Sequence, residues 1–142
     1  MLDSPKNGNA VPYGMSSLAL AHLGDAVYEL LVRTRLCMTE RTSGQLHRQT
    51  VRCVCAQAQA EAAQAILPLL SEQETTVFMH ARNAHVSHVP QGASPAQYSQ
   101  ATALEALFGY LYLNGDNERI DSLFKCCWDA LQAKENRCGQ AQ

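Results

Sequence analysis

Two acidic residues, Asp25 and Glu29, stand four positions apart in the otherwise apolar segment LGDAVYEL at residues 23–30. Residues with this spacing share one face of an α-helix, so the two carboxylates can point toward the same place. Carboxylates about 4 Å apart repel by roughly 1 kcal/mol in water and roughly 4 kcal/mol near a protein surface, and a divalent cation between them turns this repulsion into attraction. The alternative is a solvated helix face on which Glu29 pairs with Arg33.

A third carboxylate, that of Glu105, is the only acidic group in the segment 95–113. Gly109 follows one turn later, where glycine costs about 1 kcal/mol of helix propensity relative to alanine. This glycine predicts that another backbone or a ligand comes close on that face. Either Glu105 points to solvent beside a helix-packing glycine, or it faces Asp25 across a pair of helices, which is how helical bundles build cation sites.

The segments that carry these acidic residues, and those around them, are all predicted to be helical. A serine or threonine followed three residues later by Gln or Glu predicts helix starts at Thr42, Ser71 and Ser94. The expected helices run from 16 or 17 to about 37, from 42 through 54, in an alanine- and glutamine-rich stretch ending near 67–68, from 71 to about 84, from 95 to 113, and from about 117 to 133. The sequence therefore predicts an all-α domain of about six helices over residues 16–133, with a flexible segment at 1–15 and a frayed tail at 134–142.

The composition is that of a compact protein: 46% of the 142 residues are hydrophobic and 17% are charged. No apolar run approaches the length of a membrane span and no secretory signal is evident, so we expect a cytoplasmic protein that does not contact a membrane. The six cysteines include two close pairs, at 53/55 and 126/127, whose spacing suits neither a local disulfide nor zinc. We therefore expect free, mostly buried thiols.

The charge is unevenly distributed along the chain. The formal net charge is −2, yet residues 33–52 hold five arginines and a single acid. This basic segment is explained either by contacts to phosphates or by a solvated helix face. The arginines are Arg33, Arg35, Arg41, Arg48 and Arg52.

Three motifs in this chain resemble those of a known family. The segment at residues 23–30 closely resembles the signature helix of the ribonuclease III endonuclease domain, and LEALFGYLYL at 104–113 resembles its second carboxylate helix. The segment ARNA at 81–84, followed by HVP at 88–90, resembles Mini-ribonuclease III, the short bacterial branch without a double-stranded RNA-binding domain. The resemblance spans roughly residues 16–133, with the motifs in the expected order.

This resemblance implies an all-helical homodimeric hydrolase that cuts double-stranded RNA with Mg²⁺, or with Mn²⁺ as a substitute, and leaves 5′-phosphate and 3′-hydroxyl ends. It further implies a role in maturing large-subunit ribosomal RNA precursors, with a large-subunit ribosomal protein as a partner that helps select the site. Asp25 and Glu105 would be the catalytic metal ligands. Glu29 is either a further metal ligand or the partner of Arg33.

The chain departs from the family at two positions. Ribonuclease III enzymes generally carry Glu where this chain has Ala21, and Asp where it has Thr102. With fewer protein ligands, a complete two-metal site is not expected without substrate. His22 is expected either to pack in the core or, like Thr102, to contact the metal ligands rather than the metal. The expected RNA contacts are Arg33, Arg48, Arg52, Arg82, Asn83, His85 and His88.

Two other functions remain open from the sequence. A catalytically silent member of the fold would act as an RNA-binding or ribosome-assembly module. A helical dimer that binds only protein would show no dependence on magnesium and would not retain double-stranded RNA at low salt.

Overall fold

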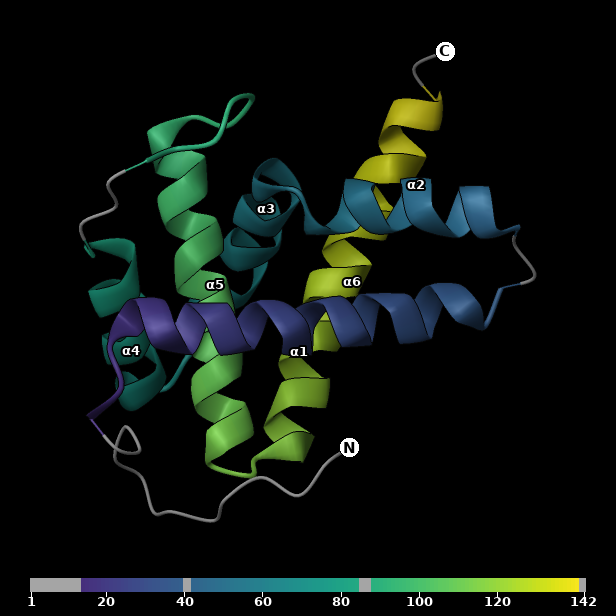
Figure 1. Ribbon diagram of the computed structural model, residues 1–142. Coiled ribbons are helices and arrows are strands. Elements are labelled where there is room, and N and C mark those ends of the chain that lie inside the picture. Colours follow the sequence, from purple (N-terminus) through teal and green to yellow (C-terminus); the bar gives the residue numbers. More distant parts are fainter. Residues whose placement is uncertain (1–13, 40–41, 85–87, 141–142) are drawn as a thin grey trace.

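The computed structural model describes residues 14–39, 42–84 and 88–140, and within these ranges every regular element is a helix (Figure 1). The prediction of an all-α fold with about six helices is confirmed. The elements are α1 (Ser17–Cys37), α2 (Ser43–Val54), α3 (Ala56–Ile66), the short 3₁₀ turn η2 (Leu67–Leu69), α4 (Glu72–Arg82), α5 (Pro95–Leu113) and α6 (Asn117–Gln140).

The helix starts lie where the caps predict them. Ser16 caps α1, and complete capping boxes open α2 at Thr42, α4 at Ser71 and α5 at Ser94. In each box the side-chain oxygen of the cap accepts from the backbone N–H three residues on, while the Gln or Glu there accepts from the backbone N–H of the cap. Two of the otherwise unpaired N–H groups of the first turn are thereby satisfied.

The predicted end of the last helix, near residue 133, is wrong, because α6 continues through Gln140. The prediction followed the apolar pattern, which fades in this region. Charged contacts accompany the extension instead: Lys134 pairs with Glu61 of α3, and Glu135 lies 3.9 Å from Arg52 of α2. The first pair joins the far end of α6 to α3, which packs against it, and the second joins it to α2.

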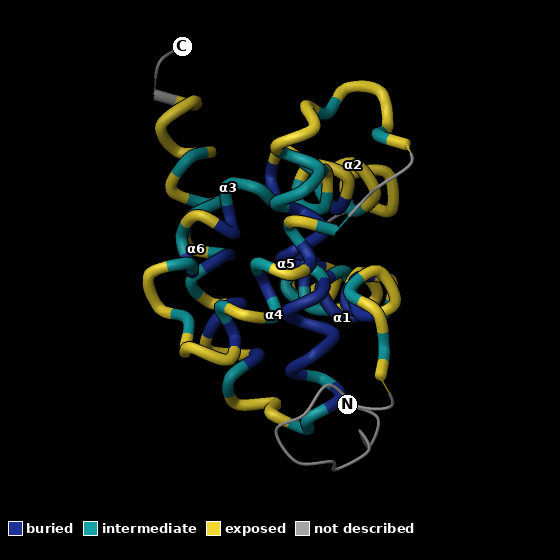
Figure 2. Tube along the Cα trace, turned by 90° about the vertical axis from the view of Figure 1, so that its left-hand side faces the viewer, coloured by how far each residue is buried: buried dark blue, intermediate teal, exposed yellow. Residues whose placement is uncertain are grey.

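Helix α5 is the centre of the molecule. Of its 19 residues, 11 are buried, because α1, α3, α4 and α6 all pack against it (Figure 2). A helix that is apolar nearly all round is stable only inside such a bundle. The aromatic ring of Tyr28 meets Phe108 and Phe124 edge-on, at centroid distances of 5.3 and 5.5 Å. These rings join α1, α5 and α6 in one core.

An ion pair links α4 to α6. The guanidinium of Arg119 donates to both carboxylate oxygens of Glu74, at 2.9 and 2.8 Å, and to the carbonyl oxygen of Leu69 at 2.7 Å. Burial alone would raise the pKa of Glu74, but hydrogen bonds from Arg119 and Ser71 and the charge of Arg119 together hold that pKa below its usual value. Glu74 is therefore ionised although it is buried.

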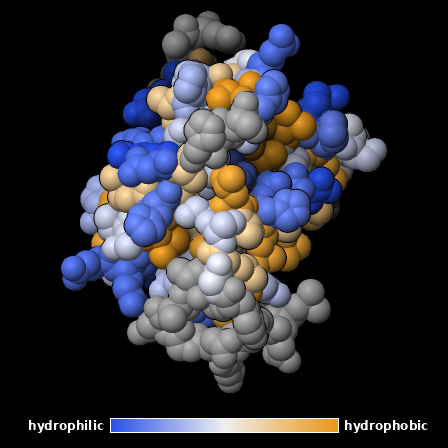
Figure 3. All heavy atoms as spheres, turned by 60° about the vertical axis from the view of Figure 1, so that its left-hand side comes forward, coloured by the Kyte–Doolittle hydropathy of each residue, from blue (hydrophilic) through white to orange (hydrophobic). Residues whose placement is uncertain are grey.

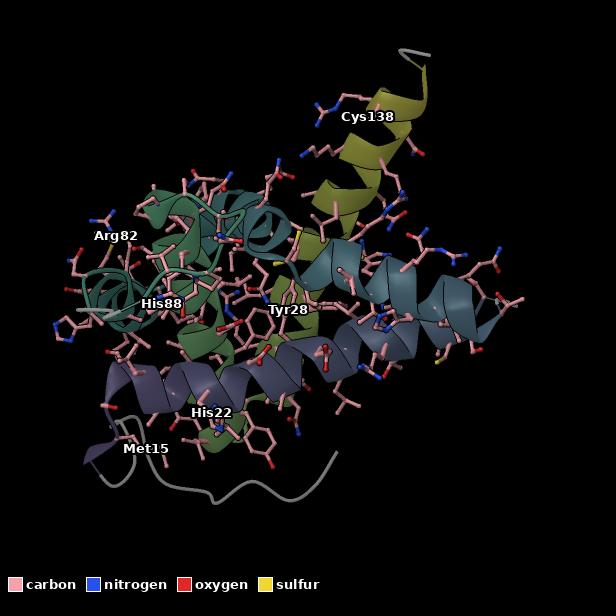
Figure 4. All side chains as sticks on the ribbon, turned by 45° about the horizontal axis from the view of Figure 1, so that its top comes forward. Met15, His22, Tyr28, Arg82, His88 and Cys138 are labelled. Atoms are coloured by element: carbon pink, nitrogen blue, oxygen red, sulfur yellow. The ribbon has the colours of Figure 1, made fainter. Side chains whose placement is uncertain are left out.

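The cysteines depart from expectation. All six are free thiols, but only Cys127 is buried, so the prediction of mostly buried thiols is wrong. Cys37 and Cys55 fall at helix ends, and Cys138 lies where α6 has left the core (Figure 4).

Hydrophobic and hydrophilic residues both occur on the surface. Figure 3 shows hydrophobic and hydrophilic side chains interleaved on one face. Within the described ranges, no helix is both long enough and apolar enough to cross a membrane.

Candidate metal and RNA site

The candidate site forms where α1 crosses α5 with the two backbones in direct contact. A Cβ added to Gly24 would lie 1.5 Å from the carbonyl oxygen of Glu105, and one added to Gly109 would lie 2.2 Å from the carbonyl oxygen of Leu20. Only glycine allows this backbone contact. The neighbour predicted to approach Gly109 is thus the backbone of α1.

This crossing brings Asp25 and Glu105 to one place. Asp25 directly follows the glycine that rests on the backbone of Glu105. Asp25 is exposed, whereas Glu105 is partly buried. The prediction that the two carboxylates face each other across a helix pair agrees with their electrostatics, because the charge of Asp25 is felt at Glu105.

The pKa values show that ionising both carboxylates together is unfavourable. Burial, followed by the negative charge of Asp25, raises the pKa of Glu105 to about 8, although the nearby Gln59 amide lowers it somewhat. The pKa of Asp25 is raised by partial burial and then by Glu29, while His22 lowers it. Because burial makes Glu105 the weaker acid of the two, the pair holds its first proton there.

Two neighbouring carboxylates that are unfavourable to ionise together are suited to binding a divalent cation. A cation beside them would compensate the charge that burial disfavours, and carboxylate oxygens are the donors that Mg²⁺ prefers. The protein contribution is small, however. No group of three or more His, Cys, Asp or Glu side chains able to hold a metal ion occurs in the part of the chain that the structure describes.

Glu29 contacts a different partner. Its carboxylate lies 3.5 Å from the guanidinium of Arg33, one turn further along α1. Of the two roles considered for Glu29, the structure contains the ion pair with Arg33. Both side chains are well exposed, so the pair contributes little to stability.

His22 and Thr102 differ in their surroundings. His22 is exposed, so the expectation of a packed histidine is wrong; the residue lies one turn before Asp25 and lowers the pKa of that carboxyl. Thr102 is buried, and its hydroxyl donates to the carbonyl oxygen of Tyr98 at 2.9 Å. Thr102 stands one turn before Glu105 but has no proton left to donate to it.

A pocket of about 320 Å³ opens beside Glu105. Its wall combines α3, α5 and the segment 90–93, and it includes Thr102 and Gln59. Sequence reasoning missed Gln59. The only signal was a glutamine in a helix otherwise rich in alanine, which does not tell a buried glutamine from its exposed neighbours. A larger pocket of about 380 Å³ lies between α2, α3 and the end of α6 and contains neither Asp25 nor Glu105.

The expected RNA contacts lie on two sides of the crossing. Arg48 and Arg52 are exposed on α2, whereas Arg82 and His88 lie on the opposite side of α5, with α4 (Figures 1 and 4). The guanidinium of Arg82 donates to the side-chain oxygen of its neighbour Asn83, at 3.4 Å.

Two other arginines, both on α1, make contacts within the protein. Arg33 pairs with Glu29, and Arg35 stacks over the ring of Phe124 at 5.6 Å. His85 lies outside the described residues.

Comparison with known proteins places the chain in a family of nucleases. Residues 18–116 match the model of the ribonuclease III domain. The sequence is 41% identical to Mini-ribonuclease 3 of Symbiobacterium thermophilum over 87% of this chain and 95% of that one. It is 45% identical to Mini-ribonuclease 3 of Gloeobacter violaceus over 80% of this chain and 82% of the other. The fold resembles the crystal structure of a Fusobacterium nucleatum protein, with a TM-score of 0.75 and 29% identity over 80% of this chain and 91% of that chain.

The fold and the matched domain define an endoribonuclease of the ribonuclease III class. The chain belongs to the ribonuclease III family, in its Mini-ribonuclease III branch. The family is generally metal-dependent, acts on double-stranded RNA and is typically dimeric.

Proposed function

We propose that this endoribonuclease cleaves double-stranded RNA with Mg²⁺, and that Asp25 and Glu105 are its catalytic metal ligands. The observation that carries the proposal is the glycine-mediated crossing of α1 and α5, which sets an exposed and a partly buried carboxylate beside each other. The raised pKa of Glu105, about 8, supports it, because a cation would favour the ionised carboxylate that burial and the charge of Asp25 disfavour.

The two carboxylates have different roles. Glu105, held on the buried helix α5, would anchor the ion, and Asp25, exposed on α1, would be the ligand accessible to solvent and substrate. Neither acts as a free general base. When bound, Mg²⁺, or Mn²⁺ in its place, supplies Lewis-acid activation and charge neutralisation for hydrolysis of a phosphodiester to 5′-phosphate and 3′-hydroxyl ends.

RNA binding comes from the basic residues flanking the crossing. A-form RNA is recognised mainly by its shape, its phosphates and its 2′-hydroxyls. Donors on both sides of the crossing, all exposed except the half-buried Arg82, support contacts to phosphates on either side of the scissile bond. These donors are Arg48 and Arg52 on one side, and Arg82, Asn83 and His88 on the other.

The active form is proposed to be a homodimer. Helix α1 exposes a strip of side chains spaced four residues apart that includes two large apolar ones, Leu18 and Leu30, which are 45% and 51% exposed. Exposed apolar side chains so close to the site support an interface there. Maturation of large-subunit ribosomal RNA precursors, help from a large-subunit ribosomal protein and a cytoplasmic location remain predictions from the family resemblance.

The test is cleavage of a long RNA duplex by the purified protein in Mg²⁺, in Mn²⁺ and in EDTA. Asp25→Asn and Glu105→Gln should each lower the rate in Mg²⁺ by about 100-fold or more, because each removes a charged group acting on the transition state. The matched control is Asp121→Asn, which changes an exposed aspartate on α6. Glu29→Gln should retain most activity, because Glu29 pairs with Arg33.

Two outcomes would overturn the proposal. Full activity of Asp25→Asn or Glu105→Gln would remove that residue from the site. Intact duplex under every condition, and an intact ribosomal RNA precursor with added ribosomal protein, would favour the silent RNA-binding module instead.

A further inference from the structure

Gln59 of α3 is a polar side chain buried in the interior of the protein. It is 2% exposed, on a helix whose other buried residues are three alanines and Ile66. Its amide nitrogen has no hydrogen-bond partner among the described residues. An unpartnered buried amide is destabilising compared with an apolar side chain of the same size. Its presence requires a reason other than stability.

The position of this amide supplies the reason. Gln59 and Glu105 line the same pocket, because α3 packs directly against α5. The amide is close enough to lower the pKa of Glu105, although burial and Asp25 raise that pKa more strongly. The nitrogen nevertheless makes no hydrogen bond of good geometry. The amide nitrogen of Gln59 is therefore a hydrogen-bond donor that lies near the carboxylate of Glu105 without a hydrogen-bond partner.

Gln57, Gln91 and Tyr98 also line the pocket and carry donors, but Gln57 and Gln91 are exposed and Tyr98 is half-buried, whereas Gln59 is buried. Thr102, one turn before Glu105, already donates its hydroxyl proton to Tyr98. Ala56 and Ala101, which also line the pocket, have no polar side chain. The amide of Gln59 has two N–H donors and no charge, so it can stabilise a carboxylate without competing for a cation.

We propose that Gln59 is a positioning residue of the metal site, whose amide N–H donates to the carboxylate of Glu105 when that carboxylate holds a divalent cation. The hydrogen bond fixes the orientation of Glu105 and so strengthens cation binding. Groups that orient metal ligands in this way typically change metal affinity or activity by about 10- to 100-fold when removed. The inference rests on the proposed function, because it assumes that Glu105 is a metal ligand.

The experiment compares Gln59→Leu with Gln64→Leu, the same change at an exposed glutamine of the same helix. Three properties are measured on the full chain: Mn²⁺ affinity by electron paramagnetic resonance, melting temperature in EDTA, and duplex cleavage over a series of Mg²⁺ concentrations. Gln59→Met, which is unbranched like glutamine, is the second variant in case leucine does not fit.

We expect Gln59→Leu to melt at or above the wild-type temperature and to bind Mn²⁺ about 10-fold or more weakly. Its cleavage deficit should shrink as Mg²⁺ is raised. Gln64→Leu should match the wild type in cation affinity and cleavage. A residue that only supported the fold would instead lower the melting temperature and leave the cation affinity unchanged.

Several results would overturn the inference. These are wild-type Mn²⁺ affinity in Gln59→Leu, or a cleavage deficit that is equal at all Mg²⁺ concentrations. Loss of folding in both the leucine and the methionine variants would also contradict it, because the amide is inferred to contribute nothing to stability. If the wild type itself neither binds Mn²⁺ nor cleaves RNA, the proposed function fails, which is a different result.

Discussion

Replacing Gly24 with alanine is the most direct test of how the site is built. The new Cβ would lie 1.5 Å from the carbonyl oxygen of Glu105 and 2.8 Å from the backbone nitrogen of Gly109. An ordinary contact begins near 3.4 Å, so α1 and α5 must separate by about 2 Å (3.4 minus 1.5). Both obstacles are helix backbone, and no side-chain rotation can relieve them.

The energetic cost follows from two opposing effects. Overpacking costs about 1–3 kcal/mol, and this rigid contact belongs at the upper end of that range. Alanine regains about 1 kcal/mol of helix propensity. The free energy of unfolding should therefore fall by about 2 kcal/mol, which lowers the melting temperature by roughly 6–10 °C in a chain of this size.

The effect on activity should be larger than the effect on stability. Separating the helices moves Asp25 away from Glu105, and a displacement of about 1 Å in a catalytic site can cost about 100-fold in rate. Cleavage is measured at a temperature where circular dichroism shows Gly24→Ala to be folded. The control is Gly44→Ala on α2, where the nearest atom to the new Cβ is the flexible end of Arg48 at 3.5 Å. Wild-type stability and cleavage in Gly24→Ala would show that the backbone contact at Gly24 does not position Asp25 beside Glu105.

Three further predictions concern stability, pH and salt. Arg119→Ala leaves the buried carboxylate of Glu74 without its partner and should cost about 3 kcal/mol in denaturant unfolding, whereas Lys125→Ala, at an exposed pair, should change little. Native Glu105 keeps its proton up to about pH 8 and the unfolded chain loses it near 4.5, so the metal-free protein binds more protons when folded. Its stability should therefore fall between those pH values, by about 1 kcal/mol per unit in melts, and Glu105→Gln should abolish that fall. Arg48→Ala should reduce the salt dependence of duplex binding by about 0.7–0.9 in log–log slope, and an unchanged slope would exclude a phosphate contact.

The sequence predicted the features that depend on local chemistry. Capping boxes identify helix starts because their hydrogen bonds lie within four residues, and all three predicted boxes are present. Gly109 predicted that another group lies close to this helix, because glycine in a helix interior is unfavourable unless something close by requires the missing side chain. Such a signal shows that something comes near, but it does not name the neighbour. That neighbour is the backbone of Leu20.

The features that the sequence did not predict depend on how the helices pack against one another. His22 is exposed because its face of α1 is not covered by α5, and the sequence spacing alone allowed a packed position. Gln59 is buried while Gln57 and Gln64 on the same helix are exposed. The difference is set by the packing of α3 on α5, two helices that residues 67–94 separate in the chain. No periodicity in an alanine- and glutamine-rich helix encodes that choice.

The glycines at the crossing of α1 and α5 determine how close the two carboxylates come to each other. Without a side chain at Gly24, the carbonyl of Glu105 rests on α1, and the next residue of α1 is Asp25. Burial of Glu105, and then the charge of Asp25 that the same crossing brings near, raise the pKa of Glu105 to about 8. A cation that binds near neutral pH must therefore displace a proton from Glu105, so its affinity should increase as the pH rises toward 8. Metal-free protein loses stability over that same range, and the bound ion should restore it.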